Sequence, residues 1–139
     1  MKPRSRYFLD AGIFPLILAG AASVKRFVEE IASGRAEPFT CEINLAEFYA
    51  KTCEKKGREV ADIYYLRIRY QPSMTVIACN EELTKKAAWL KCKHRNKVSL
   101  ADCYAAAAAS MEEAVLLTTD TSLSKVATTE NITTKNIPI

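Results

Sequence analysis

Short apolar segments alternate along the chain with longer segments in which apolar residues recur at helical spacing. The short segments are rich in branched and aromatic residues, which is typical of buried strands. Five of them are predicted as strands: residues 6–9, 38–41, 74–79, 115–119 and 131–139. Because strands that alternate with helices favour a parallel sheet covered on both faces, the pattern predicts an α/β fold with a mostly parallel sheet.

Capping residues mark where several predicted helices begin and end. Ser23, Asn80 and Ser99 each precede a helical repeat of apolar residues, so we expect them to be N-caps. Gly34 and Gly57 follow such repeats and are expected to end helices. Predicted helices lie at 24–33, 43–56, 58–70 and 100–113, and further ones follow residues 10, 80 and 122.

Length and composition are typical of a small globular protein. With 139 residues, 49% of them hydrophobic and 26% charged, the chain suits a single domain spanning residues 1–139. Its longest apolar run, Ala11–Ala22, is shorter than the roughly 18 residues of a membrane span and contains Pro15. Asp10 precedes this run and no strong cleavage pattern follows, so we expect a cytoplasmic protein with no membrane association.

The densest basic stretch of the chain has four cations: Lys91, Lys93, Arg95 and Lys97. Cations near the end of a helix complement its dipole, so one interpretation is a solvated helix end. The other is a rim that contacts phosphate groups, because the stretch comes directly before the predicted helix at 100–113. The net charge of +4 permits either interpretation. His94, within the stretch, is expected to be an ordinary helix-end residue.

Two aspartates directly follow apolar strands. Asp10 closes the strand at 6–9, and Asp120 follows the strand at 115–119. Aspartate is common where a strand ends in a turn, so each alone indicates little. However, sheets of this type bind ligands beyond the carboxyl ends of their strands, and both residues are expected there.

Two further acids lie in predicted helices. Glu47 shares a helix face with Ile43, Ala46 and Ala50, which we interpret as the buried face, where a carboxylate needs a partner. A boundary position that reaches water is the alternative. Asp102 fits a capping pattern at the start of an alanine-rich helix, whose small side chains would allow close approach to the sheet. Capping and a role in a site are compatible for this residue.

Four carboxylates held close together repel one another unless a cation is present. Oxygen ligands of this kind suit Mg²⁺ or Mn²⁺. The chain has one histidine, His94, and its five cysteines include no C-x-x-C pair, which argues against zinc. The cysteines are expected to be reduced, small apolar side chains. The sequence therefore predicts a site for a divalent metal ion.

The acids occur within four ordered motifs: Tyr-Phe-Leu-Asp at 7–10, Ile-Asn-Leu-Ala-Glu at 43–47, Ser-Leu-Ala-Asp at 99–102 and Leu-Leu-Thr-Thr-Asp at 116–120. This ordered set, which covers nearly the whole chain, resembles the PIN domain family, especially the VapC-type toxins of toxin–antitoxin systems. The resemblance implies a Rossmann-like α/β/α sandwich. It also implies Mg²⁺- or Mn²⁺-dependent endoribonuclease activity, a homodimer, and a small antitoxin protein that blocks the site.

The family's functional residues map onto five positions of this chain. Asp10, Glu47, Asp102 and Asp120 match the family's catalytic, metal-binding acids, and Thr118 matches a supporting hydroxyl residue. Asp10 and Asp102 are the first choices for direct metal ligands. The other two acids would be ligands or would position water. Under this resemblance, the basic residues of 91–97 would contact the RNA backbone.

The chain departs from the family pattern at two places. Ala11 and Gly12 stand where the family has a small hydroxyl residue followed by Asn or Ser, so a supporting hydrogen bond to Asp10 is expected to be missing. Thr121 and Ser122 stand where another acid is common, and either is expected to support the metal instead. The alternative function is a catalytically silent PIN-like module that binds RNA or protein. A phosphatase of the haloacid dehalogenase type would need a second aspartate at position 12, which is glycine.

Overall fold

The computed structural model describes residues 4–139, and its five strands form one parallel sheet. The strands are β1 (Ser5–Leu9), β2 (Ala36–Cys41), β3 (Thr75–Ile77), β4 (Val115–Thr118) and β5 (Thr134–Asn136). Their order across the sheet is β3-β2-β1-β4-β5, and each neighbouring pair is parallel. The predicted α/β fold is confirmed, and β1 lies at its centre.

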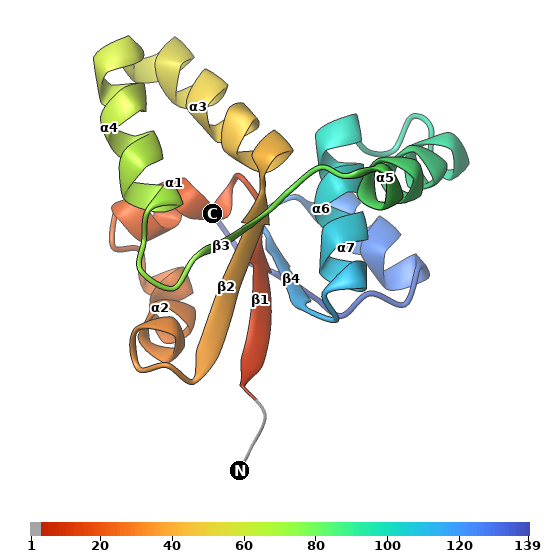
Figure 1. Cartoon of the computed structure of the whole chain (residues 1–139), viewed down its shortest axis with the longest axis horizontal. Helices are drawn as coiled ribbons and strands as arrows, with labels where there is room; N and C mark the ends of the chain where they lie inside the picture. Colours follow the sequence, from red (N-terminus) through yellow and green to blue (C-terminus); the bar gives the residue numbers. More distant parts are fainter. Residues whose placement is uncertain (1–3) are drawn as a thin grey trace.

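Helices cover both faces of the sheet, as expected for parallel strands joined by crossovers. They are α1 (Ile13–Leu18), α2 (Lys25–Ala32), α3 (Glu42–Lys56), α4 (Arg58–Arg69), α5 (Glu81–Lys93), α6 (Leu100–Met111) and α7 (Thr121–Thr129). Figure 1 shows α1 to α4 on one side of the strands and α5 to α7 on the other. No helix within residues 4–139 is long and apolar enough to span a membrane.

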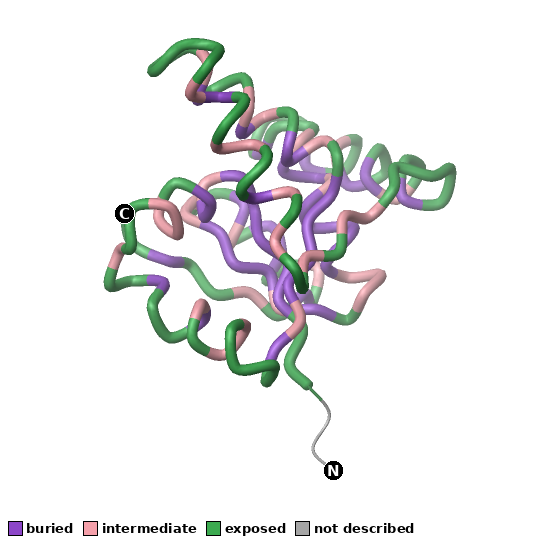
Figure 2. Tube along the Cα trace, turned by 60° about the vertical axis from the view of Figure 1, so that its left-hand side comes forward, coloured by how far each residue is buried: buried purple, intermediate pink, exposed green. Residues whose placement is uncertain are grey.

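Alternate side chains of β1 enter two separate clusters of buried residues. Tyr7 and Leu9 pack with α1, α2 and α3, whereas Phe8 packs with α5, α6 and α7. This two-residue alternation is what places one strand between two apolar layers. Figure 2 shows the buried positions gathered along the strands and on the helix faces turned toward them. The carboxyl end of β1 therefore lies in the middle of the sheet, between the two apolar layers.

The alanine run of α6 is buried throughout. Ala105–Ala109 each have at most 1% of their surface exposed, and they pack in the cluster that contains Phe8 and Leu116. Because a methyl group is the whole side chain, α6 contacts β1 and β2 at close range while α5 covers its other side. The expected close approach of this helix is confirmed.

Most predicted caps are observed, but one prediction was wrong. Asn80 accepts a hydrogen bond from the N–H of Leu83 at 2.9 Å, and Ser99 begins α6. Gly34 and Gly57 follow helices with positive φ, as their lack of a side chain permits. Ser23, in contrast, lies inside a 3-10 turn, so its backbone is already helical and its side chain caps nothing. An N-cap needs an extended backbone at that point.

The buried face of α3 differs from the predicted one, and α4 packs beside it. In α3, Ala46 and Ala50 are exposed, and the buried residues are Asn44, Leu45, Phe48 and Thr52. In α4, Ala61 and Ile68 are buried, whereas Ile63 has 56% of its surface exposed. These helices pack against each other as a pair that extends beyond the sheet, so each has an additional contact face besides the one toward the strands (Figure 1).

Candidate metal centre at the end of the sheet

Asp10 directly follows the central strand and is almost fully buried, with 4% of its surface exposed. Its Oδ1 accepts hydrogen bonds from the backbone N–H of Ala11 at 2.9 Å and from Nδ2 of Asn44 at 3.2 Å. Its Oδ2 accepts one from the hydroxyl of Thr118 at 2.8 Å. Donors from the loop after β1, from α3 and from β4 therefore fix the orientation of this carboxylate.

The surroundings of Asp10 disfavour its charge. Burial raises the pKa of its carboxyl from 3.8 to about 6, although the hydrogen bond from Thr118 lowers it. The negative charges of Asp102 and Glu47 raise the pKa as well. At neutral pH, Asp10 is thus an anion with little access to water and two like charges nearby. A bound cation would relieve both unfavourable effects.

Asp102 begins α6 and is buried beside the same strand ends. Its Oδ2 accepts a hydrogen bond from the N–H of Ser99 at 3.1 Å, and its own N–H donates to the Ser99 hydroxyl at 3.1 Å, which forms a capping box. Burial raises the pKa of the Asp102 carboxyl, and the charges of Asp120 and Glu47 act in the same direction. Asp102 is therefore both a helix cap and a member of the acidic cluster, as the sequence allowed.

Thr118 links two of the acids across the end of β4. Its buried hydroxyl donates to Asp10 and accepts from the backbone N–H of Asp120 at 3.0 Å. The Oδ1 of Asp120 accepts from the N–H of Leu123 at 3.0 Å, so Asp120 is the N-cap of α7. The helix predicted after Ser122 therefore starts earlier, at Thr121, because the side chain of Asp120 caps it.

Glu47 extends from the second turn of α3 and is partly exposed. Its Oε1 forms an ion pair with Nζ of Lys51, one turn later, at 3.1 Å. The hydrogen bond that the Lys51 ammonium donates to Glu47 raises the pKa of Lys51, and the charges of Asp10 and Asp102 add to the effect. Lys51 therefore provides a positive charge from the protein itself that faces this group of acids.

The four carboxylates influence one another electrostatically, but they are not drawn together. Within residues 4–139, no three Asp, Glu, His or Cys side chains lie close enough to hold a metal ion as they stand. Local partners explain the spacing: Ser99 holds Asp102, the first turn of α7 holds Asp120, and Lys51 holds Glu47. Mutual repulsion of carboxylates favours the same outcome. The set still fits a hard divalent cation, because all of its charged donors are oxygens.

Asn44 is the residue that sequence reasoning missed. It is fully buried, donates to Asp10 through Nδ2, and accepts through Oδ1 from the thiol of Cys41 at 2.9 Å. Burial raises the pKa of Cys41 to about 11, so this thiol keeps the proton it donates. Positions 11 and 12 were expected to leave Asp10 without a supporting side-chain hydrogen bond, and Asn44 supplies one instead. The signal available in the sequence was a lone amide beside Leu45 in an apolar helical stripe.

Gly12 departs from the family pattern at a position where the side chain of Thr119 leaves no room for a Cβ. Its φ of −68° suits any residue, but a Cβ at this position would lie 2.4 Å from Oγ1 of Thr119. The side chain of Thr119 therefore occupies the volume that a larger residue after Ala11 would need. The departure at position 12 is therefore an adjustment to packing in this chain.

We expect Gly12→Ala to destabilise the protein by about 1–3 kcal/mol, the usual range for an added methyl group in a packed region. Thr119→Ala should remove most of this loss when the two changes are combined, because it deletes the hydroxyl that the methyl group meets. Urea unfolding of the two single variants and the double variant measures the coupling. Additive losses would show that the two side chains do not compete for one space.

Other predicted site residues have different surroundings. The hydroxyl of Thr121 accepts a hydrogen bond from Asn136 at 3.3 Å, and Ser122 is exposed in a groove beside His94. In the basic stretch, the ammonium of Lys91 donates to the carbonyl oxygen of Val98 at 2.7 Å. Lys93 pairs with Glu130 at 2.9 Å, and Nε2 of His94 lies 2.8 Å from the same carboxylate. These contacts agree with the interpretation of the stretch as a helix end.

All five cysteines are free thiols. Cys41 and Cys103 are buried, in agreement with the expected apolar role, whereas Cys79 and Cys92 are exposed.

Sequence comparison places the chain in a known family. The model of the PIN domain family matches residues 7–128, which is most of the chain and includes all four acids. No curated protein matches the chain.

Solved structures share the fold at low sequence identity. VapBC2 from Rickettsia felis, bound to a DNA fragment from its promoter, matches with a TM-score of 0.73 at 20% identity, over 95% of this chain and 98% of that one. VapBC-1 from nontypeable Haemophilus influenzae matches with a TM-score of 0.71 at 17% identity, over 94% of this chain and 97% of that one. VapC20 from Mycobacterium tuberculosis, a toxin that cleaves the sarcin–ricin loop, matches with a TM-score of 0.63 at 19% identity, over 79% of this chain and 86% of that one.

Proposed function

Because the chain belongs to the PIN domain family, we propose that it is a divalent-metal-dependent endoribonuclease. The observation that supports this most strongly is Asp10. A carboxylate buried at the central strand end, with its pKa raised by burial and by neighbouring acids, is unfavourable for the fold itself. Such an arrangement is typical of functional sites.

In this proposal Asp10 and Asp102 hold the metal, Mg²⁺ or Mn²⁺, and Glu47 and Asp120 either join them or position water. When bound, the ion would lower the pKa of a coordinated water and stabilise negative charge on the phosphodiester. Thr118 and Asn44 keep the Asp10 carboxylate oriented toward the other acids. For Thr121 and Ser122 a supporting role stays a prediction.

The structural neighbours support a proposal about the wider role. The structures from Rickettsia felis and Haemophilus influenzae are VapBC complexes, and VapC20 is described as a toxin. We therefore propose that this protein is the toxin of a toxin–antitoxin pair, a cytoplasmic homodimer of single-domain chains whose activity a small antitoxin blocks. The catalytically silent module is the alternative, since no three acids lie at metal-binding distance in the part of the chain described.

Cleavage of mixed-sequence single-stranded RNA by the purified protein tests the proposal. We expect cleavage with Mn²⁺ or Mg²⁺, none with EDTA, and none with Asp102→Asn, which keeps the size of the side chain but removes its charge. Glu29→Gln, an equal change at an exposed position with no ion pair in residues 4–139, is the control and should cleave normally.

Mass spectrometry of the preparation must exclude a bound antitoxin. Equal cleavage by wild type and Asp102→Asn would indicate a contaminating nuclease, and no cleavage by antitoxin-free protein would favour the silent module.

A further inference from the structure

A pocket of about 530 Å³ lies beside the metal centre, between α1 and the paired helices α3 and α4. Its inner end reaches Ala11, Gly12 and Thr119, the neighbours of Asp10 and Asp120 in the chain. None of the four acids lines it. The pocket therefore adjoins the acidic cluster without being part of it.

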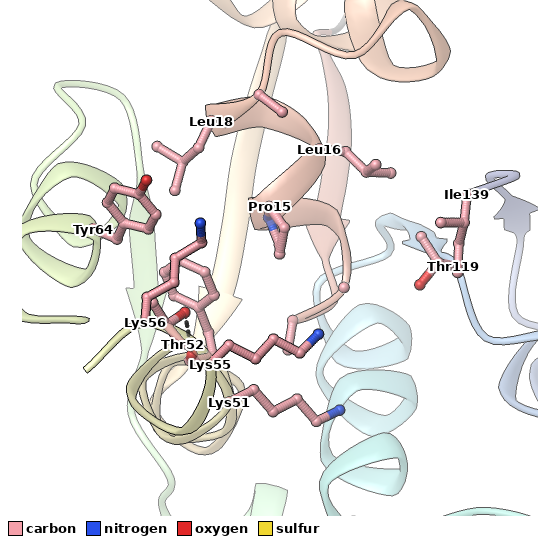
Figure 3. Close-up of a pocket in the computed structure, with 14 residues that line it drawn as sticks. Pro15, Leu16, Leu18, Lys51, Thr52, Lys55, Lys56, Tyr64, Thr119 and Ile139 are labelled. Carbon is pink, nitrogen blue, oxygen red and sulfur yellow. Dashed lines mark hydrogen bonds between the residues drawn. The ribbon is translucent and has the colours of Figure 1, made fainter. Parts of the chain in front are cut away.

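Three lysines of α3 line this pocket: Lys51, Lys55 and Lys56. Figure 3 shows the side chain of Lys56 extending toward α1 beside Tyr64, and those of Lys51 and Lys55 extending toward the side on which Thr119 lies. Glu47, Lys51 and Lys55 are spaced four residues apart, so one stripe of the helix changes from acidic to basic as it leaves the metal centre. Neither Lys55 nor Lys56 has an acidic partner among residues 4–139.

The opposite wall of the pocket is apolar. Pro15, Leu16 and Leu18 of α1 contribute aliphatic surface, and the ring of Tyr64 from α4 borders the lysines (Figure 3). A simple inorganic anion would need only the cations. A nucleotide has both a charged phosphate and a flat, largely apolar base, and single-stranded nucleic acid is bound by cationic grooves combined with aromatic surfaces. The two walls together fit that ligand.

The basic stretch predicted from the sequence is a weaker candidate for the same role, because three of its four cations are bonded within the protein. The ammonium of Lys91 is bonded to backbone carbonyl oxygens, and that of Lys93 is paired with Glu130. The ammonium groups of Lys55 and Lys56 have no such partners in the described part of the chain. Free cations next to the metal centre attract phosphates more effectively than paired ones.

We propose that this lysine pocket, defined by Lys51, Lys55, Lys56 and the surface of α1 and Tyr64, binds the RNA strand next to the phosphodiester that is cleaved. The inference rests on the proposed nuclease function, which supplies RNA as the polyanion. Lys55 and Lys56, which have no acidic partner in the described residues, contact successive phosphates. Lys51 exchanges its ion pair with Glu47 for a third phosphate as the strand passes Gly12 and Thr119 into the acidic cluster.

The test is the salt dependence of binding to a short fluorescein-labelled single-stranded RNA, measured by fluorescence anisotropy. The parent protein carries Asp102→Asn so that the RNA stays intact. In this background, Lys51→Gln, Lys55→Gln and Lys56→Gln are combined. Because each phosphate contact on a single strand contributes about 0.7 to the slope of log K against log salt, the slope should fall by about 2. Affinity at about 0.1 M salt should fall roughly 10- to 100-fold.

The matched control replaces three exposed lysines outside the pocket, Lys25, Lys85 and Lys135, with glutamine. It has the same net charge as the pocket variant. An equal loss of RNA affinity in the control and the pocket variant would show a general charge effect and would overturn the proposal. A double variant, Lys55→Gln with Lys56→Gln, leaves the Glu47 pair intact and should lose part of the slope. Thermal melts of all variants establish that each is folded.

The remaining outcomes separate this inference from the proposed function. If the pocket variant binds RNA like its parent, the pocket assignment is wrong even where the wild type cleaves RNA with Mn²⁺. If the pocket variant instead loses binding of an oligoglutamate peptide while RNA binding is unchanged, the pocket binds an acidic protein segment. If the parent binds no RNA at low salt, the inference fails, and metal-dependent cleavage by the wild type shows whether the proposed function fails as well.

Discussion

Asp10→Asn is expected to stabilise the metal-free protein by about 2 kcal/mol at a pH of about 7.5 and to abolish metal-dependent cleavage. The charge of Asp10 is held in a buried position where its pKa is raised from 3.8 to about 6, a difference equivalent to about 3 kcal/mol. Asparagine removes the charge and keeps the size. Its Nδ2 would face the Thr118 hydroxyl, which now donates to Asp10, so part of the gain is lost.

The effect depends on pH in a defined direction. Below pH 3.8 both folded and unfolded chains carry a protonated Asp10, and the residue does not oppose folding. Between pH 3.8 and about 6 the unfolded chain loses the proton first, so the stability that the raised pKa provides is lost progressively as pH rises. The advantage of Asp10→Asn should therefore be complete above pH 6 and absent in acid.

Urea unfolding at acidic and neutral pH, with and without Mn²⁺, measures both parts of this prediction. Wild type should gain stability with Mn²⁺, by about 2.7 kcal/mol when the ion is present at 100 times its Kd, and the variant should gain much less. Glu29→Gln, at an exposed position, should follow wild type throughout. A variant that is less stable than wild type at neutral pH would contradict the unfavourable charge inferred for Asp10.

Ala107→Leu is expected to destabilise the protein by 3 kcal/mol or more, at the upper end of the range of about 1–3 kcal/mol for overpacking. Ala107 has no exposed surface and belongs to a run of five buried alanines, so α6 has no open side into which a larger side chain can turn. The added atoms must displace a strand or a neighbouring helix.

Thermal and urea unfolding measure this loss, and Ala88→Leu provides the matched control. Ala88→Leu is the same substitution on the exposed side of α5, where the change in the free energy of unfolding should stay within about 0.5 kcal/mol. If the Ala107→Leu variant were as stable as the Ala88→Leu variant, the packing around α6 would have room for a larger side chain, which would contradict the prediction.

The strands, their parallel arrangement and the location of the acids were predictable from the sequence, because each depends on local patterns. A short apolar run followed by aspartate predicts a strand end, and parallel strands bring such ends to one edge. Ser99 and Asp102 form the predicted capping box because both partners lie within one turn of helix.

The orientation of α3 and α4 was not predictable in the same way. Apolar residues surround much of these two helices, so several faces satisfy the helical period, and the contact between the helices decides which is buried. The hydrogen bond from Asn44 to Asp10 was missed because it joins residues 34 positions apart in sequence.

The two ways in which acids are held here have different evolutionary consequences. Asp102 lies in the first turn of α6 and Asp120 is the N-cap of α7, so the loss of either would weaken the fold in any chain of this architecture, with or without nuclease activity. Selection for folding alone would preserve them. The buried charge of Asp10 opposes folding, so under the proposed nuclease function activity alone would maintain this residue. Among PIN-like chains of this architecture, an aspartate at the central strand end is therefore the better marker of a working enzyme, and its loss is the first expected step toward an inactive descendant.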